Sequence, residues 1–431
     1  MPDHRPQRPP GDDGPAPDDS LLLLSGARLT DGRTVDVQLR AGRIEAVGTA
    51  GSLTRTAAAD GHTGSRIDLG GYLLLPAPAE PHAHSDTALT AEAGGPASQA
   101  PADVQRRATE AALLQLGHGA TALRSHVRIG DVQGLGALEA VLQARRALRG
   151  LADLGTVAVP RILTGAAGAD GLAMLRDAVK MGASVVGGCP DLDPDPAGYA
   201  EAVLDVATEH GCAVDLHTDG DDPARLARLA AMAGGLRPGV TIGPCGGLTR
   251  LPHDVAGHTA DRLAAAGITV VCLPQGDCAA MEHDTARPAS GPPVRLLRAA
   301  GVRVAAGSGA LRDAANPVGR GDPLEAAYLL ASQGRARPED AYAAVSRDAR
   351  AAMGLPEVRV EAGFPAELLA VRGESVPGVL ALAYSRIVIH EGRVVARTSA
   401  VREYCDSPTV AALDLPRQGG PSTKVHRPPQ D

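Results

Sequence analysis

Two histidines separated by one residue, His82 and His84, are the side chains whose type and spacing most directly suggest chemistry. In an extended strand, side chains at positions i and i+2 point to the same face, so both imidazoles could reach one point. Imidazole nitrogen is a common ligand of divalent metals. An apolar stretch at residues 72–75 and a proline-rich turn precede the pair. Because 13 histidines can form such a pair by chance, its context decides how it is interpreted.

The composition excludes several classes of protein. The net charge of -8 and the aromatic content of 2% argue against nucleic-acid binding, which uses basic surfaces and stacking side chains. No apolar run approaches the roughly 18 residues that span a bilayer, and the N-terminal residues do not have the pattern of a secretory signal. Six scattered cysteines do not form a disulfide framework. We therefore expect a cytoplasmic protein without nucleic-acid or membrane partners.

The 431 residues divide into a central part flanked by two regions rich in β-strand patterns. Alternating apolar and polar residues with glycine turns predict short strands near both ends of the chain. These ends predict one small composite β-sandwich, built from residues 20–77 and 357–400 around a barrel at 78–356. Residues 1–19 and 401–431 are rich in proline, glycine and polar side chains, so we expect a disordered leader and a flexible tail.

The central part alternates short apolar strands with amphipathic helices. Counting the strand that carries His82, about eight strand–helix units are expected, which predicts a distorted (β/α)8 TIM-type barrel. In such barrels the chemistry takes place at the carboxyl ends of the strands. The other strands are expected at residues 120–126, 155–159, 185–187, 213–217, 239–242, 269–273 and 303–306.

Several motifs together resemble the amidohydrolase superfamily, specifically its cytosine deaminase-like branch. Leu73–Pro76 followed by Glu80-Pro81-His82-Ala83-His84 is similar to the opening of that barrel, and Arg124-Ser125-His126 to an Arg-Thr-His motif. The stretch from Asp215 to Pro223 resembles Asp-Ile-His-Cys-Asp-Glu-x-Asp-Asp-Pro, one residue shorter. The resemblance implies that His82, His84 and His217 could hold one divalent metal, zinc or iron.

Three positions depart from the pattern of that family. Gly220 stands where the resemblance implies the glutamate that moves protons, and Pro244 where it implies a histidine. Gly309 replaces an aspartate that binds the metal and accepts a proton from water. None of these side chains can donate, accept or coordinate. Candidate residues for the ligand pocket remain at four positions, namely His126, Arg161, Asp219 and Asp313.

Two functions follow from this pattern. The first is a degenerate homologue without the deamination chemistry of the family, acting as a small-molecule-binding or regulatory protein in which the metal is absent or retained. The alternative is an active metal-dependent hydrolase of C–N bonds in cyclic amidines or amides, using a remodelled three-histidine site. Either protein could form homo-oligomers. The missing acid and base groups favour the first, because each such group contributes about 10²–10⁴-fold to a rate.

Overall fold

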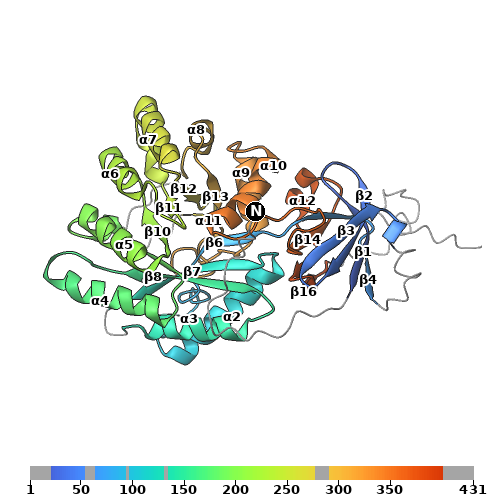
Figure 1. The fold of residues 1–431 in the computed structure, drawn as a ribbon, viewed down its shortest axis with the longest axis horizontal. Helices are drawn as coiled ribbons and strands as arrows, with labels where there is room; N and C mark the ends of the chain where they lie inside the picture. Colours follow the sequence, from blue (N-terminus) through green and yellow to red (C-terminus); the bar gives the residue numbers. More distant parts are fainter. Residues whose placement is uncertain (1–20, 54–63, 94–96, 131–133, 277–290, 401–431) are drawn as a thin grey trace, which may run out of the picture.

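The structure, a computed structural model, describes residues 21–53, 64–93, 97–130, 134–276 and 291–400. The leader expected at 1–19 and the tail expected at 401–431 lie outside the described residues. Two sheets organise the chain, and the barrel with its helices lies beside a smaller sheet assembled from both ends (Figure 1). The expected (β/α)8 barrel with an added sheet domain is confirmed.

The smaller sheet joins early and late strands in the order β16-β15-β14-β5-β1-β2-β3, with β4 paired to β1. Strands β1 and β5 share one residue pair, Arg28 with Leu73, and β1 is irregular between Leu24 and Ala27. The sheet bends there, and its two halves enclose one apolar cluster. Its strands are β1 (Leu22–Arg28), β2 (Thr34–Arg40), β3 (Arg43–Thr49), β4 (Ser65–Asp68), β5 (Tyr72–Pro76), β14 (Leu368–Arg372), β15 (Arg386–His390) and β16 (Arg393–Thr398).

Strand β5 explains why residues 72–75 are uniformly apolar. Leu74 packs into the cluster inside the bent sheet, whereas Leu73 and Leu75 pack into the barrel core. A strand buried on both faces has no polar face, so the alternating pattern disappears. This apolar run belongs to the terminal sheet, and a separate strand, β6 (Ala79–Ala83), leads to the histidines.

The barrel is a parallel sheet of eight strands in sequential order from β6 to β13. A bridge between Ala83 and Gly309 closes the seam between the first and last strands. At this seam the Glu80 carboxylate accepts hydrogen bonds from the backbone N–H groups of His82 (3.0 Å) and Ser308 (2.8 Å). The remaining strands are β7 (Ala122–Ile129), β8 (Asp153–Pro160), β9 (Val185–Gly188), β10 (Ala213–Thr218), β11 (Val240–Pro244), β12 (Thr269–Cys272) and β13 (Val304–Ala306).

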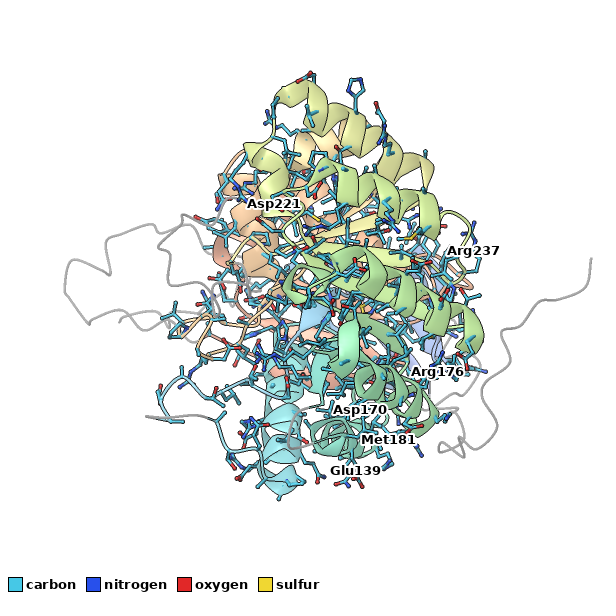
Figure 2. All side chains as sticks on the ribbon, turned by 90° about the vertical axis from the view of Figure 1, so that its left-hand side faces the viewer. Glu139, Asp170, Arg176, Met181, Asp221 and Arg237 are labelled. Atoms are coloured by element: carbon cyan, nitrogen blue, oxygen red, sulfur yellow. The ribbon has the colours of Figure 1, made fainter. Side chains whose placement is uncertain are left out.

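Helices surround the barrel with their apolar faces inward, and charged side chains such as Glu139, Asp170 and Arg176 lie on the outside (Figure 2). Asp-Pro pairs start three of them, because proline suits the first helical turn and the aspartate accepts free N–H groups. The helices are α2 (Pro101–Gly117), α3 (Gly136–Ala147), α4 (Gly165–Met181), α5 (Pro196–His210), α6 (Pro223–Ala233), α7 (His253–Ala265), α8 (Val294–Ala299), α9 (Pro323–Ser332), α10 (Pro338–Val345), α11 (Arg347–Ala352) and α12 (Val376–Leu382), with short 3₁₀ turns η2 (Pro190–Leu192) and η3 (Gly246–Arg250). Across the described ranges, none of the helices has the length and apolarity to cross a membrane.

A buried ionic group fixes the terminal sheet. His390 Nδ1, at the end of β15, lies 2.9 Å from Glu367 Oε2, and Glu391 N–H donates to Glu367 Oε1 at 2.8 Å. Burial alone would lower the pKa of His390, but Glu367 and the nearby Asp153 of the barrel outweigh it and raise that pKa. Burial would raise the pKa of Glu367, but His390 more than compensates and lowers it. Both shifts favour the charged pair.

We predict that His390→Gln lowers stability most near pH 5–6. The contribution of His390 is complete below its unfolded pKa of about 6.5 and is lost as the pH rises through its raised folded pKa. The contribution of Glu367 is present above about pH 4.3 and is lost as the pH falls through its lowered folded pKa. Denaturant titrations from pH 4 to 9 should show a gap of about 1.5–3 kcal/mol that narrows at high pH.

The control for this experiment is His258→Gln, which changes an exposed histidine of α7 and should leave the pH profile of the wild type unchanged. A stability gap for His390→Gln that grows between pH 7 and 9 would show that the charged form of His390 is not the stabilising one.

Candidate metal and ligand site

Four histidines from three strands meet at the carboxyl end of the barrel. His82 lies in β6, with His84 directly after it, His126 lies in β7 and His217 in β10. The ring centre of His82 lies 5.0 Å from that of His84, 3.9 Å from that of His126 and 5.2 Å from that of His217. The structure thus brings the three histidines expected to bind metal together and adds His126 to them. His82 and His126 are buried, whereas His84 and His217 are half-buried.

The two histidines of the His-x-His motif point their nitrogens at each other. His84 Nε2 and His82 Nε2 are 3.2 Å apart. Two nitrogens bound to one tetrahedral zinc at about 2.0–2.1 Å would lie roughly 3.3 Å apart. The separation therefore matches two ligands that share one cation, as the spacing in the sequence predicted.

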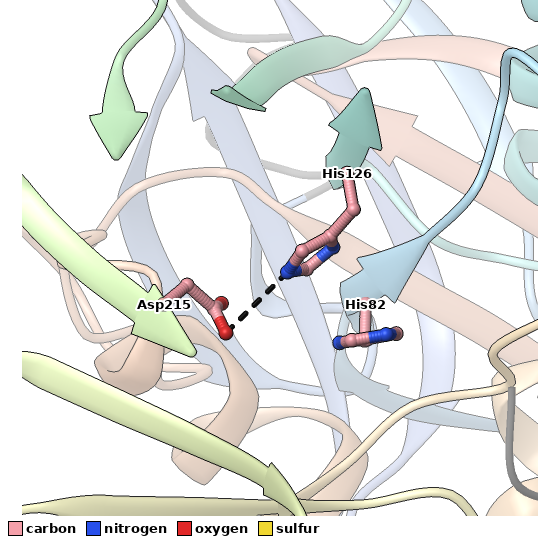
Figure 3. Close-up of side chains that lie close together, drawn as sticks. All are labelled: His82, His126 and Asp215. Atoms are coloured by element: carbon pink, nitrogen blue, oxygen red, sulfur yellow. Dashed lines mark ion pairs between the residues drawn. The ribbon is translucent and has the colours of Figure 1, made fainter. Parts of the chain in front are cut away.

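An acidic residue that the sequence analysis did not select lies beneath the histidines. Asp215 Oδ1 is 3.4 Å from His126 Nε2, and Figure 3 shows this ion pair beside His82. Arg124 Nη1 donates to Asp215 Oδ2 at 2.9 Å. The sequence did contain a signal for both residues. Asp215 stands two positions before His217, and Arg124 two positions before His126, so each shares a strand face with a site histidine.

The electrostatic environment keeps the upper histidines neutral. Burial lowers the pKa of His82 and His84 well below the usual value, and the charges of neighbouring histidines lower it further. Neutral imidazoles keep a nitrogen lone pair for a metal. Burial would raise the pKa of Asp215, but His126 and Arg124 outweigh it and lower that pKa to about 2. The site therefore places the neutral imidazoles of His82 and His84 above one ionised carboxylate.

Comparison with known proteins identifies the family. The family model described as "Amidohydrolase family" matches residues 117–396. The chain belongs to the amidohydrolase family. The resemblance found in the sequence to this superfamily is thereby confirmed.

Among proteins of known sequence, this amidohydrolase is similar to a pterin deaminase of Rhizobium rhizogenes, at 29% identity over 69% of this chain and 70% of that protein. It is also 29% identical to the uncharacterized protein YahJ of Escherichia coli, over 61% of this chain and 60% of that protein.

Solved structures share the whole fold. The 5-methylcytosine deaminase of Klebsiella pneumoniae, liganded with 5-fluorocytosine, gives a TM-score of 0.76 at 25% identity, covering 90% of this chain and 100% of that one. The N-isopropylammelide isopropylaminohydrolase of Burkholderia multivorans gives 0.75 at 24% identity, with coverage of 89% and 100%.

Two overlapping groups of residues in this amidohydrolase are candidates for holding one divalent metal. In the first, which is the predicted set, the Nε2 atoms of His82 and His84 lie 3.2 Å apart and the ring centres of His82 and His217 lie 5.2 Å apart. The second is His82, His126 and Asp215, whose donor atoms all lie within 4.8 Å of one another. We expect the first set to be the better ligand group, because Asp215 is already bound by Arg124 and His126.

Two of the other predicted pocket residues, Asp219 and Asp313, accept hydrogen bonds from loops at this end of the barrel. Asp219 Oδ1 accepts from Gly247 N–H at 2.8 Å, and its other oxygen pairs with Arg250. Asp313 Oδ1 accepts backbone N–H groups at Ala315 and Asn316, and Oδ2 accepts from Thr87 Oγ1 at 3.2 Å. Arg161 follows β8 and is exposed.

The three substituted positions have backbones suited to the residues now there. Gly220 and Gly309 have φ angles of +71° and +69°, a region that residues with a Cβ rarely adopt. Gly309 also forms the bridge that closes the barrel. Pro244 ends β11 and is buried. These positions therefore offer backbone to the site and no polar side chain.

Glu80, two residues before His82, was not selected from the sequence either. Burial raises the pKa of its carboxyl group to about 7, although the hydrogen bonds from Ser308 and His82 act in the opposite direction. Its partners are the backbone N–H groups of His82 and Ser308 and the hydroxyl group of Ser308. Glu80 therefore holds the strand that carries the His-x-His motif against the last strand of the barrel.

We predict that the purified protein binds close to one zinc ion per chain and that His84→Ala and His217→Ala each reduce this strongly. Each variant removes an imidazole from the predicted donor set, and both residues are half-buried, so the fold should tolerate the change. Elemental analysis after dialysis against zinc measures the content, with His258→Ala as the control. Equal zinc in all four proteins would exclude this donor set.

We predict that Arg124→Met destabilises the fold by about 3–5 kcal/mol, because it leaves the Asp215 carboxylate buried without its cation. The double variant Arg124→Met/Asp215→Leu should recover much of this loss, since neither charge is then buried. Denaturant unfolding gives both values. The exposed pair of Arg337 and Asp340 provides the control, and Arg337→Met should leave the unfolding midpoint essentially unchanged.

Proposed function

We propose that this amidohydrolase binds a small planar nitrogen heterocycle at the mouth of its barrel and does not deaminate it. The observation that carries the proposal is the residue set Gly220, Pro244 and Gly309 at the positions where the family resemblance implies proton-transfer and metal-binding groups. Hydrolytic deamination needs an acceptor for the proton of water and a donor for the departing amine. Glycine and proline provide neither.

Asp215, Asp219 and Asp313 do not replace the missing groups. Asp215 has a pKa of about 2 and is paired with Arg124 and His126, so it holds a proton poorly at neutral pH. In Asp219 and Asp313 both carboxylate oxygens already accept hydrogen bonds from loop groups. These contacts support a role in shaping the mouth of the barrel.

The similar proteins indicate the kind of ligand. One of them is named a pterin deaminase, and another is a 5-methylcytosine deaminase liganded with 5-fluorocytosine. From these proteins we infer that the ligand is a planar ring that contains nitrogen. The half-buried imidazoles of His84 and His217 offer hydrogen-bonding partners for its ring nitrogens and carbonyl groups.

A second function, hydrolysis of a C–N bond, is favoured by one specific contact. His126 Nε2 lies 3.4 Å from the ionised Asp215 carboxylate, and its ring packs against His82, with ring centres 3.9 Å apart. An imidazole beside a carboxylate is a common general base. If the histidine group holds a metal, which would supply an activated water, His126 is the residue of this chain placed to accept a proton.

We predict that the zinc-loaded protein binds 5-methylcytosine or pterin and releases no ammonia from either. Calorimetry measures the binding, and a coupled ammonia assay measures turnover. Both are needed because the proposal requires binding without turnover. Turnover that is lost in His126→Gln, but kept in the exposed control His258→Gln, would overturn the proposal and establish the second function. Absence of binding for every ring tested would exclude the proposed binding of a planar nitrogen heterocycle.

A further inference from the structure

Strand β7 carries a third basic residue above the histidine group. Alternate residues of this strand face the interior of the barrel, where Arg124 contacts Asp215 and His126 lies against His82. Arg128 is the next residue in this row. It is exposed at the end of the strand, whereas Arg124 and His126 are buried. The row therefore runs from a buried ion pair, through an imidazole, to a guanidinium at the mouth.

The neighbouring strand supplies a second arginine at the same end. Strands β7 and β8 are parallel, and Arg128 pairs in register with Val159. Arg161 follows two positions later and is also exposed. Directly paired residues of parallel strands share a face, and so do residues two apart. Arg161 is the first residue after the end of β8, so it lies at the same end of the barrel as Arg128.

The charge of Arg128 acts on the site itself. Together with burial and the neighbouring histidines, it lowers the pKa of His84. The carboxyl group of Asp86 is the acid near Arg128, and its burial raises its pKa despite that arginine. Asp219 is paired with Arg250 instead. The β7 side of the mouth therefore carries the guanidinium of Arg128 close to His84, with the carboxyl group of Asp86 nearby.

We propose that the ligand of this site carries a carboxylate and that Arg128, with Arg161 beside it, binds this group. The inference rests on the proposed function, because it concerns a ligand bound at the same mouth. A guanidinium has five N–H donors and no acceptor, and a carboxylate has only acceptors, so the two match in a bidentate pair. Arginine also remains charged at any physiological pH, which suits a fixed anion-binding position.

The test compares rings that differ only in the anionic group. Calorimetry on the full-length protein measures binding of 5-methylcytosine and 5-carboxycytosine, with uracil and orotate as a second pair. We expect the carboxylate to improve affinity at least about tenfold in the wild type, as charge-assisted hydrogen bonds do. In Arg128→Gln this advantage should fall to within about twofold. Arg128→Lys should retain part of it, because the charge remains but the bidentate geometry does not.

Arg146→Gln, an exposed substitution on α3 outside the mouth, is the matched control and should keep the full advantage. Equal affinity for the neutral and anionic rings in the wild type would overturn the carboxylate proposal and leave the proposed function intact. An advantage that persists in Arg128→Gln would exclude this arginine as the anchor. Failure of all four rings to bind would overturn the proposed function, and this inference with it.

Discussion

The ion pair of Arg124 and Asp215 is the interaction on which the site depends. It joins β7 to β10 across the interior of the barrel, and Arg124 also donates to Thr241 Oγ1 of β11 and to the carbonyl group of Ala352. Two buried charges are tolerated only when each is paired and hydrogen-bonded. These contacts fix the floor beneath the histidines, so their rings are positioned before any ligand arrives.

Above this floor the site changes in polarity along the barrel axis. An ionised carboxylate lies lowest, neutral imidazoles lie next, and the guanidinium of Arg128 lies at the open end. Such an arrangement suits the proposed binding function, because binding needs shape and complementary charge but no proton acceptor. The engagement of Asp219 and Asp313 by loops fits this view, since their carboxylates stabilise the rim.

Much of the barrel could be predicted from the sequence because its strands and helices differ in their apolar period and three of its helices begin at recognisable Asp-Pro pairs. Residues 72–75 were harder to interpret. A strand buried on both faces has no period, so the sequence could not separate a barrel strand from a strand of the terminal sheet. The pairing of β5 with β14, nearly 300 residues later, decides the matter.

By itself, the sequence determined the family, the His-x-His pair and the presence of glycine or proline at positions 220, 244 and 309, since these depend only on residue type and spacing. The tertiary structure decided which distant residues meet. His126 joins the other histidines and Asp215 pairs with Arg124 because parallel strands bring positions about 90 residues apart to the same level of one barrel. The tertiary structure also decided the ionisation states of His82 and Asp215, because burial and neighbouring charges set each pKa.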